Sequence, residues 1–134
     1  MLCDASPLIA LADEKQVAHT RCTAVLETLP SNLLTTWPCF TEAMYLLYTF
    51  GGYPLQRLLW EYVERGALRF YALTEADAIR MQALMAQYRD MPMDLADASL
   101  VAAAEALRLT SIFTLDSDFY VYRVNGKTPF EVMP

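Results

Sequence analysis

Short apolar runs alternate with longer amphipathic segments along this chain, and turn or capping residues separate them. A short apolar run bounded by polar or turn residues favours a buried strand, whereas apolar positions recurring every three or four residues favour a helix. The predicted strands are 1–4, 33–36, 68–72 and 111–115, with a further short strand before the C-terminal proline. The predicted helices are 7–12, 16–29, 38–50, 54–65, 75–88 and 95–107.

Capping and stop residues set the ends of several of these helices. Ser6, directly before a proline, is expected to cap the first helix, and Thr74 and Asp94 are expected to cap the last two. Gly51 and the glycine after it end the helix 38–50. Strands that alternate with helices predict an α/β domain with a mostly parallel sheet, in which ligands bind beyond the carboxyl ends of the strands.

Composition narrows the classes of protein that fit. The 134 residues suit one domain, and 55% of them are apolar, so a disordered chain is excluded. The net charge of −6 argues against binding nucleic acid through bulk electrostatics, although a local contact stays open. We see no signal peptide and no uninterrupted apolar run long enough for a membrane span. Three cysteines without metal or redox spacing favour a reducing, cytoplasmic location.

Glu42 is the most unusual charge in the chain. It is the only charged residue between Glu27 and Arg57, and it lies in the apolar run 40–47. If that run is buried, the carboxylate needs compensation, because the dipole of a helix N-terminus contributes only about 0.3–1 kcal/mol. We therefore expect Glu42 to be functional.

Other isolated carboxylates end apolar segments in the same way. Asp4 follows the first strand, Asp97 lies in the first turn of the helix 95–107, and Asp116 ends the run 112–115. The predicted sheet gathers these groups with Glu42 at one edge, and like charges gather only around a cation. The pattern predicts a divalent metal site with oxygen ligands, for which Mg²⁺ or Mn²⁺ is suited.

Some of the acidic residues also have structural interpretations. Asp4 suits a turn that hydrogen-bonds the backbone, and Asp94 suits an N-cap better than a ligand. Asp116 and Asp118 lie two residues apart. Asp116 is the better ligand because it is nearer the end of the strand, and Asp118 is a cap or a second-sphere residue. Ser6 is more suited to capping than to ligation, although its hydroxyl could hold a water.

Other kinds of site are poorly supported. The only histidine, His19, is expected on the surface of an amphipathic helix, so neither a histidine-based zinc site nor a serine–histidine triad fits. No glycine-rich phosphate loop is present. A phosphohydrolase with an aspartate nucleophile would need a nearby lysine, and neither Lys15 nor Lys127 is suitably placed.

Four segments together carry a family resemblance: Asp4-Ala5-Ser6, Thr41-Glu42-Ala43, the run from Asp94 to Ala102, and the run from Thr114 to Phe119. In order and spacing they resemble a PIN domain and, more narrowly, the VapC-type ribonuclease toxins of toxin–antitoxin pairs. The resemblance implies a single PIN-like domain over residues 1–134, with three α/β/α layers and a central, mostly parallel sheet.

The same resemblance implies a metal-dependent endoribonuclease that acts as a homodimer and is inhibited by an antitoxin. Its acidic set falls on Asp4, Glu42, Asp97 and Asp116, with Mg²⁺ or Mn²⁺ as the cofactor and RNA as the substrate. Accessory candidates are Ser6, Asp94, Thr114 and Asp118, and candidates for phosphate contact are Arg123 and Lys127. The alternative is a catalytically inactive PIN-fold module that only binds a partner; the complete acidic set argues against it.

The helices 38–50 and 54–65 carry more large apolar side chains than one small core can cover. Both are apolar around much of their circumference. The large apolar side chains on these helices and the turn between them are Tyr45, Leu47, Tyr48, Phe50, Tyr53, Leu55, Leu58, Leu59, Trp60 and Tyr62. We expect this pair of helices to be covered by a second copy, by an antitoxin segment or by both. The alternative is that these side chains fill the domain's own core.

Overall fold

The computed structural model describes every residue from Met1 to Pro134. Five strands form one sheet in the order β3-β2-β1-β4-β7, and every neighbouring pair is parallel. These strands are β1 (Leu2–Cys3), β2 (Leu33–Thr35), β3 (Leu68–Phe70), β4 (Ser111–Phe113) and β7 (Glu131–Met133). The predicted parallel sheet is therefore confirmed, including the short strand before the terminal proline.

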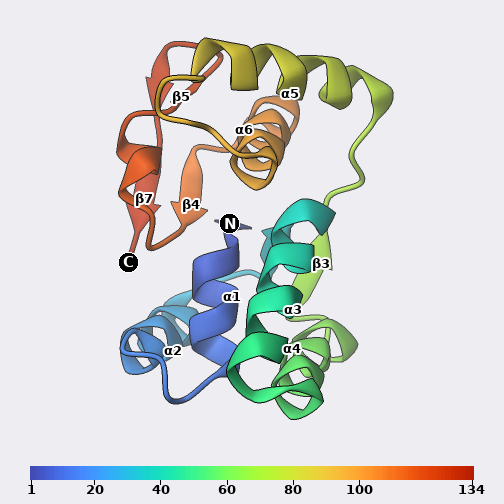
Figure 1. Cartoon of the computed structure of the whole chain (residues 1–134). Coiled ribbons are helices and arrows are strands. Elements are labelled where there is room, and N and C mark those ends of the chain that lie inside the picture. Colours follow the sequence, from blue (N-terminus) through green and yellow to red (C-terminus); the bar gives the residue numbers. More distant parts are fainter.

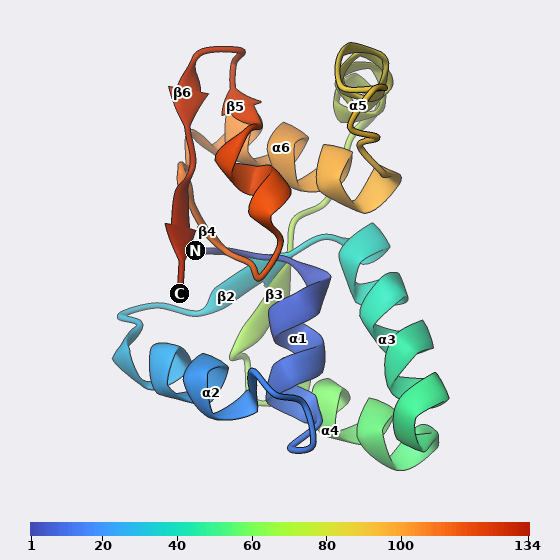
Figure 2. The same cartoon turned by 60° about the vertical axis from the view of Figure 1, so that its left-hand side comes forward.

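Six helices flank the sheet, so the predicted three-layer α/β/α architecture is confirmed. They are α1 (Ala5–Ala12), α2 (His19–Thr28), α3 (Trp37–Gly51), α4 (Tyr53–Glu64), α5 (Glu75–Gln87) and α6 (Leu95–Leu107). Helix α1 packs against α2, α3 and α4, and α5 packs against α6. Figure 1 shows these two groups below and above the sheet, and Figure 2 shows the sheet between them from the side. None of the helices combines the length and the apolar character needed to cross a membrane.

The core is centred on β1, β4 and α6. Both residues of β1 are fully buried, and α6 is buried continuously from Ala96 to Ala104. A helix that is apolar around its whole circumference must be enclosed by other elements, and the small side chains of α6 allow it to lie close to β1. The three cysteines are buried, free thiols.

The first helix does not begin where the sequence predicts. Asp4 rather than Ser6 is the N-cap of α1: the backbone N–H of Ala5 donates to Asp4 Oδ1 at 2.7 Å. The Ser6 hydroxyl instead accepts a hydrogen bond from the backbone N–H of Leu115 at 3.1 Å. The prediction for Ser6 was wrong because its hydroxyl joins two segments far apart in sequence, which local capping rules cannot detect.

Two further local differences concern loops. Helix α2 begins at His19, so the part of the predicted helix before that residue, including the fully exposed Val17, is a turn. The C-terminal segment contains a small hairpin of β5 (Arg123–Val124) and β6 (Thr128–Pro129), which the sequence did not predict. Between β4 and this hairpin lies the 3-10 helix η1 (Ser117–Tyr120).

Candidate metal centre

Three carboxylates from distant parts of the chain meet beyond the carboxyl ends of β1 and β4. Asp4 directly follows β1, Asp116 lies three residues after β4, and Asp97 lies in the first turn of α6. Each offers one oxygen that is within 4.8 Å of those of the other two. They line a pocket of about 250 Å³ together with Ser6, Ile9, Glu42, Leu46, Asp94 and Leu115. Because β1 and β4 are adjacent and parallel, their carboxyl ends meet at the same edge of the sheet.

Asp4 is held by hydrogen bonds to both of its carboxylate oxygens. In addition to the backbone N–H of Ala5 on Oδ1, the hydroxyl of Thr114 donates to Oδ2 at 2.7 Å. Burial raises the pKa of Asp4 above its ordinary value, the two hydrogen bonds oppose that rise, and the charges of Asp116 and Asp94 add to it. The side chain is thus fixed in position while its ionised form remains costly.

Thr114 links two members of the cluster. While its hydroxyl donates to Asp4, the same oxygen accepts from the backbone N–H of Asp116 at 3.0 Å. This fully enclosed side chain therefore sets the spacing of Asp4 and Asp116. Thr114, which the sequence named as an accessory candidate, positions the two carboxylates through these bonds.

Asp97 is buried, with 6% of its surface exposed, and its carboxylate Oδ2 accepts a hydrogen bond from the hydroxyl of Tyr122 at 2.9 Å. Burial raises its pKa to about 7, the charge of Asp94 adds to the rise, and the bond from Tyr122 opposes it. Asp94 is the N-cap of α6, as predicted, and accepts from the backbone N–H of Asp97 at 2.7 Å. The cap thus places a second negative charge next to Asp97.

Sequence reasoning missed Tyr122. This fully buried residue also packs edge-on against Phe119 and Tyr88, with ring centroids 5.1 and 5.0 Å away. A buried tyrosine hydroxyl requires a hydrogen-bonding partner, but nothing in the sequence indicates that this partner is Asp97, 25 residues away.

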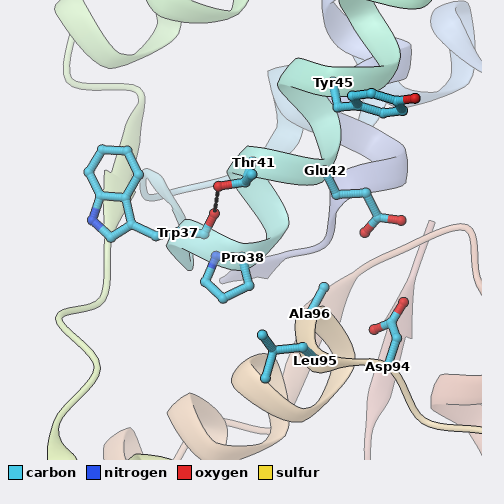
Figure 3. Close-up of a pocket in the computed structure, with 8 residues that line it drawn as sticks. All are labelled: Trp37, Pro38, Thr41, Glu42, Tyr45, Asp94, Leu95 and Ala96. Atoms are coloured by element: carbon cyan, nitrogen blue, oxygen red, sulfur yellow. Dashed lines mark hydrogen bonds between the residues drawn. The ribbon is translucent and has the colours of Figure 1, made fainter.

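Glu42 reaches the site from α3, but it is exposed rather than buried. The expectation that burial makes this carboxylate costly is therefore wrong, because Phe40, Ala43 and Leu47 turn toward the core while Glu42 lies on the outer face of the helix. Partial desolvation, followed by the charges of Asp94, Asp4 and Asp116, nevertheless raises its pKa. Figure 3 shows the carboxylates of Glu42 and Asp94 pointing toward each other in a neighbouring pocket, which both residues also line.

Asp116 and Asp118 have different positions. Asp116 lines the pocket and also caps η1, because its Oδ1 accepts from the backbone N–H of Asp118 at 2.9 Å. Asp118 does not line the pocket. Asp116 therefore has the capping role that the sequence considered for Asp118, and it also contributes an oxygen to the carboxylate cluster.

The two cations considered for phosphate contact do not reach the site. One guanidinium nitrogen of Arg123 donates to three backbone carbonyls, those of residues 120–122, and neither Arg123 nor Lys127 lines the pocket. Among the basic side chains, Arg21 of α2 lines a pocket next to the cluster. This pocket of about 140 Å³ shares Leu115 and Asp116 with the metal pocket. Sequence analysis gave no signal for Arg21.

The donor set of the pocket fits a hard divalent cation. No lysine, arginine or histidine lines it, so the charges of its carboxylates are not balanced within the protein. The Nδ1 atom of His19 lies 2.7 Å from the carbonyl oxygen of Ala10, and burial raises the pKa values of Cys3 and Cys39, which keeps them neutral. Carboxylate and hydroxyl oxygens remain as ligands, and these suit Mg²⁺ or Mn²⁺.

Comparison with known proteins gives consistent matches over nearly the whole chain. The family model of the PIN domain matches residues 1–125. Ribonuclease VapC26 of Mycobacterium tuberculosis is 25% identical over 135 residues, which cover 100% of each protein. The crystal structure of Mycobacterium tuberculosis VapC20, described as a sarcin-ricin loop cleaving toxin, superposes with a TM-score of 0.82 at 15% identity, covering 90% of this chain and 92% of that one. A toxin–antitoxin complex from Klebsiella pneumoniae gives a TM-score of 0.65 at 23% identity, covering 88% of each chain.

Proposed function

The chain belongs to the PIN domain family, and on that premise we propose that it is a metal-dependent endoribonuclease, the toxin of a VapC-type toxin–antitoxin pair. One observation carries the proposal: Asp4, Asp97 and Asp116 bring oxygens within 4.8 Å of one another in a pocket that no cationic side chain lines. The protein similar to it over its full length is named a ribonuclease, which supports RNA as the substrate.

Asp4, Asp97 and Asp116 are the proposed ligands of Mg²⁺ or Mn²⁺. A bound divalent ion supplies positive charge for the phosphoryl oxygens and increases the acidity of water. Thr114 and Tyr122 keep the carboxylates of Asp4 and Asp97 in fixed orientations, so little reorganisation is needed when substrate arrives.

Glu42 is the proposed acceptor of the proton of the attacking water. Its raised pKa makes it a stronger base than an ordinary carboxylate, and its exposed position at the pocket entrance leaves room for water and a phosphodiester. The water oxygen bonds to phosphorus, the bond from phosphorus to the leaving nucleotide oxygen breaks, and the water proton passes to Glu42.

The proposed protein partners are an antitoxin and a second copy of the chain. A solved relative of the same fold comes from a toxin–antitoxin complex. Of the large apolar side chains on α3 and α4, Leu47 and Leu59 are buried in the domain's own core. Tyr45, Tyr48, Phe50, Tyr53 and Leu58 are exposed and are the part of the set that a partner could cover. We propose the cytoplasm as its location, which suits three buried free thiols, and a single domain over residues 1–134.

The second candidate is a PIN-fold module that binds a partner without cleaving RNA. A cleavage assay on total RNA with and without Mg²⁺ or Mn²⁺ separates the two. Cleavage by the parent protein that requires the ion, and that is lost in Asp4→Asn and Asp116→Asn, is the result expected for the nuclease. Asp90→Asn, an exposed loop substitution, is the control. Equal cleavage by the parent and both site variants would identify a contaminating nuclease, and no cleavage by any of them would favour the binding module.

A further inference from the structure

A second, larger pocket of about 690 Å³ opens beside the candidate metal centre. Glu42 and Asp94 line both pockets, so the two are continuous. Its other wall is the face of α3 that carries Trp37, Thr41 and Tyr45, which lie on one stripe because they are four residues apart (Figure 3). A polymer with one phosphate at the metal centre therefore has its neighbouring unit beside this stripe.

The two aromatic rings of this groove offer flat surfaces. Trp37 stacks on Phe70 with centroids 4.0 Å apart and an interplanar angle of 7°, and Phe40 meets it edge-on at 5.6 Å. These contacts hold one indole face, yet half of the residue is exposed, so the opposite face is open. Tyr45 is 71% exposed and is not part of any aromatic pair in the structure. Trp37, which is held by these contacts and half-exposed, can stack on a base with little further loss of side-chain entropy.

Charge explains why stacking matters in this protein. Proteins usually gain much of their affinity for nucleic acid from lysine and arginine contacts to phosphates. None of the lysines or arginines lines either the metal pocket or the aromatic groove, and Arg21 is the one cation in the pocket that adjoins the other side of the cluster. Aromatic side chains provide affinity for single strands without requiring a particular base, since every base has a flat face.

We propose that the groove along Trp37 and Tyr45 is a subsite for unpaired nucleobases that flank the scissile phosphate. This inference rests on the proposed ribonuclease function and specifies its substrate as single-stranded or loop RNA, because bases in a duplex are stacked on one another and unavailable. Eight residues of helix place the Cα atoms of Trp37 and Tyr45 about 12 Å apart along the axis, so we expect their rings to contact different nucleotides. Recognition then depends more on bases than on backbone charge.

The test measures binding rather than cleavage. In an Asp97→Asn background, which keeps the strand intact, fluorescence anisotropy with Mg²⁺ compares a short labelled oligoadenylate with a base-free ribose-phosphate strand of equal length. We expect the oligoadenylate to bind more tightly, and Tyr45→Ala to weaken its binding roughly ten-fold while leaving the base-free strand unaffected. Trp37→Phe should keep most of the affinity that Trp37→Ala loses.

Tyr48→Ala is the control for loss of the proposed partner surface, since Tyr48 is an exposed tyrosine of α3 (64%, against 71% for Tyr45) that belongs to that surface but does not line the groove. Melting temperatures verify that every variant is folded. The logarithm of the binding constant should fall with the logarithm of salt with a slope near −0.7, for about one phosphate contact, and Arg21→Gln should flatten it further.

Equal affinity for the two strands, equal effects of Tyr45→Ala and Tyr48→Ala, no binding of the oligoadenylate, or a slope steeper than about −2 would each overturn the subsite. The groove would then be assigned to binding of a protein partner. Cleavage of total RNA by protein with native Asp97 tests the nuclease separately, so failure of the subsite and failure of the proposed function give different results.

Discussion

Replacing Asp97 with asparagine should stabilise the metal-free protein, and the gain should depend on pH. Burial and the charge of Asp94 raise the pKa of Asp97 from 3.8 to about 7. A carboxyl group with a raised pKa in the folded state destabilises the fold when it ionises. The destabilisation is absent below about pH 4, grows as the pH rises toward 7, and is complete above that.

The size of the effect follows from the same shift. About three pKa units at about 1.36 kcal/mol per unit correspond to a destabilisation of the folded state by roughly 4 kcal/mol at pH 8. At pH 5 the same linkage relation gives a destabilisation of roughly 2 kcal/mol. Asparagine keeps an oxygen that can accept from Tyr122, but its amide hydrogens need partners in the buried site. We therefore expect a net gain of about 1–3 kcal/mol at pH 8, or a rise of roughly 4–10 °C in melting temperature.

The assay is urea and thermal unfolding of the parent and Asp97→Asn, with a metal chelator, at pH 5 and pH 8. Asp90→Asn, an exposed substitution, controls for the change in net charge. Addition of Mg²⁺ should reverse the order of stability, because the parent gains binding energy that the variant lacks. A variant that is less stable than the parent at pH 8 without metal, or a difference that is the same at both pH values, would refute the electrostatic reasoning.

Four further predictions concern the site and the surface. Millimolar Mg²⁺ or Mn²⁺ should raise the melting temperature of the parent. If the ion changes neither the melting temperature nor the heat measured by calorimetry, the metal centre is contradicted. Asp94→Asn should retain stability and most RNA cleavage while Asp94→Ala loses about 1 kcal/mol in urea unfolding; a loss of cleavage in Asp94→Asn as large as that in Asp97→Asn would make Asp94 a ligand. Tyr122→Phe removes the donor that opposes the raised pKa of Asp97, so the pH midpoint of Mg²⁺ binding should move upward, and an unchanged midpoint would contradict that role. Light scattering at tens of micromolar should give a dimer mass for the parent and a smaller mass for Tyr48→Glu; a monomer mass in both would remove the homodimer.

Sequence reasoning predicted the parts of the site that depend on the order of elements. Asp4 and Asp116 each follow a strand of the sheet, and parallel neighbours must bring such residues to the same edge. The caps at Thr74 and Asp94 were predictable as well, because capping is a local interaction that a few residues determine.

The remaining parts depend on contacts between distant segments. The apolar run around Glu42 predicted burial, but the rotation of α3 about its axis, set by its packing against α1 and α6, leaves that carboxylate outside. The bonds of Ser6 to Leu115 and of Tyr122 to Asp97 join residues separated by 109 and 25 positions. Arg21 approaches Asp116 only because α2 packs beside α1. The hydrophobic repeat of a strand, every two residues, and that of a helix, every 3.6 residues, do not indicate these contacts between distant segments.

The three carboxylates of the cluster are far apart in the sequence, so the order of synthesis determines when the cluster can form. Asp4 is made first, but Thr114, which orients it, and Asp116, which completes the cluster, are made 110 or more residues later. The central strand β1 can complete its pairing only after β4, its neighbour on one side, has been synthesised. A nascent chain that ends before residue 114 therefore contains Glu42 and Asp97 without a complete cluster. The carboxylate cluster can therefore form only after Asp116 has been synthesised, and any shorter nascent chain lacks one of its three members.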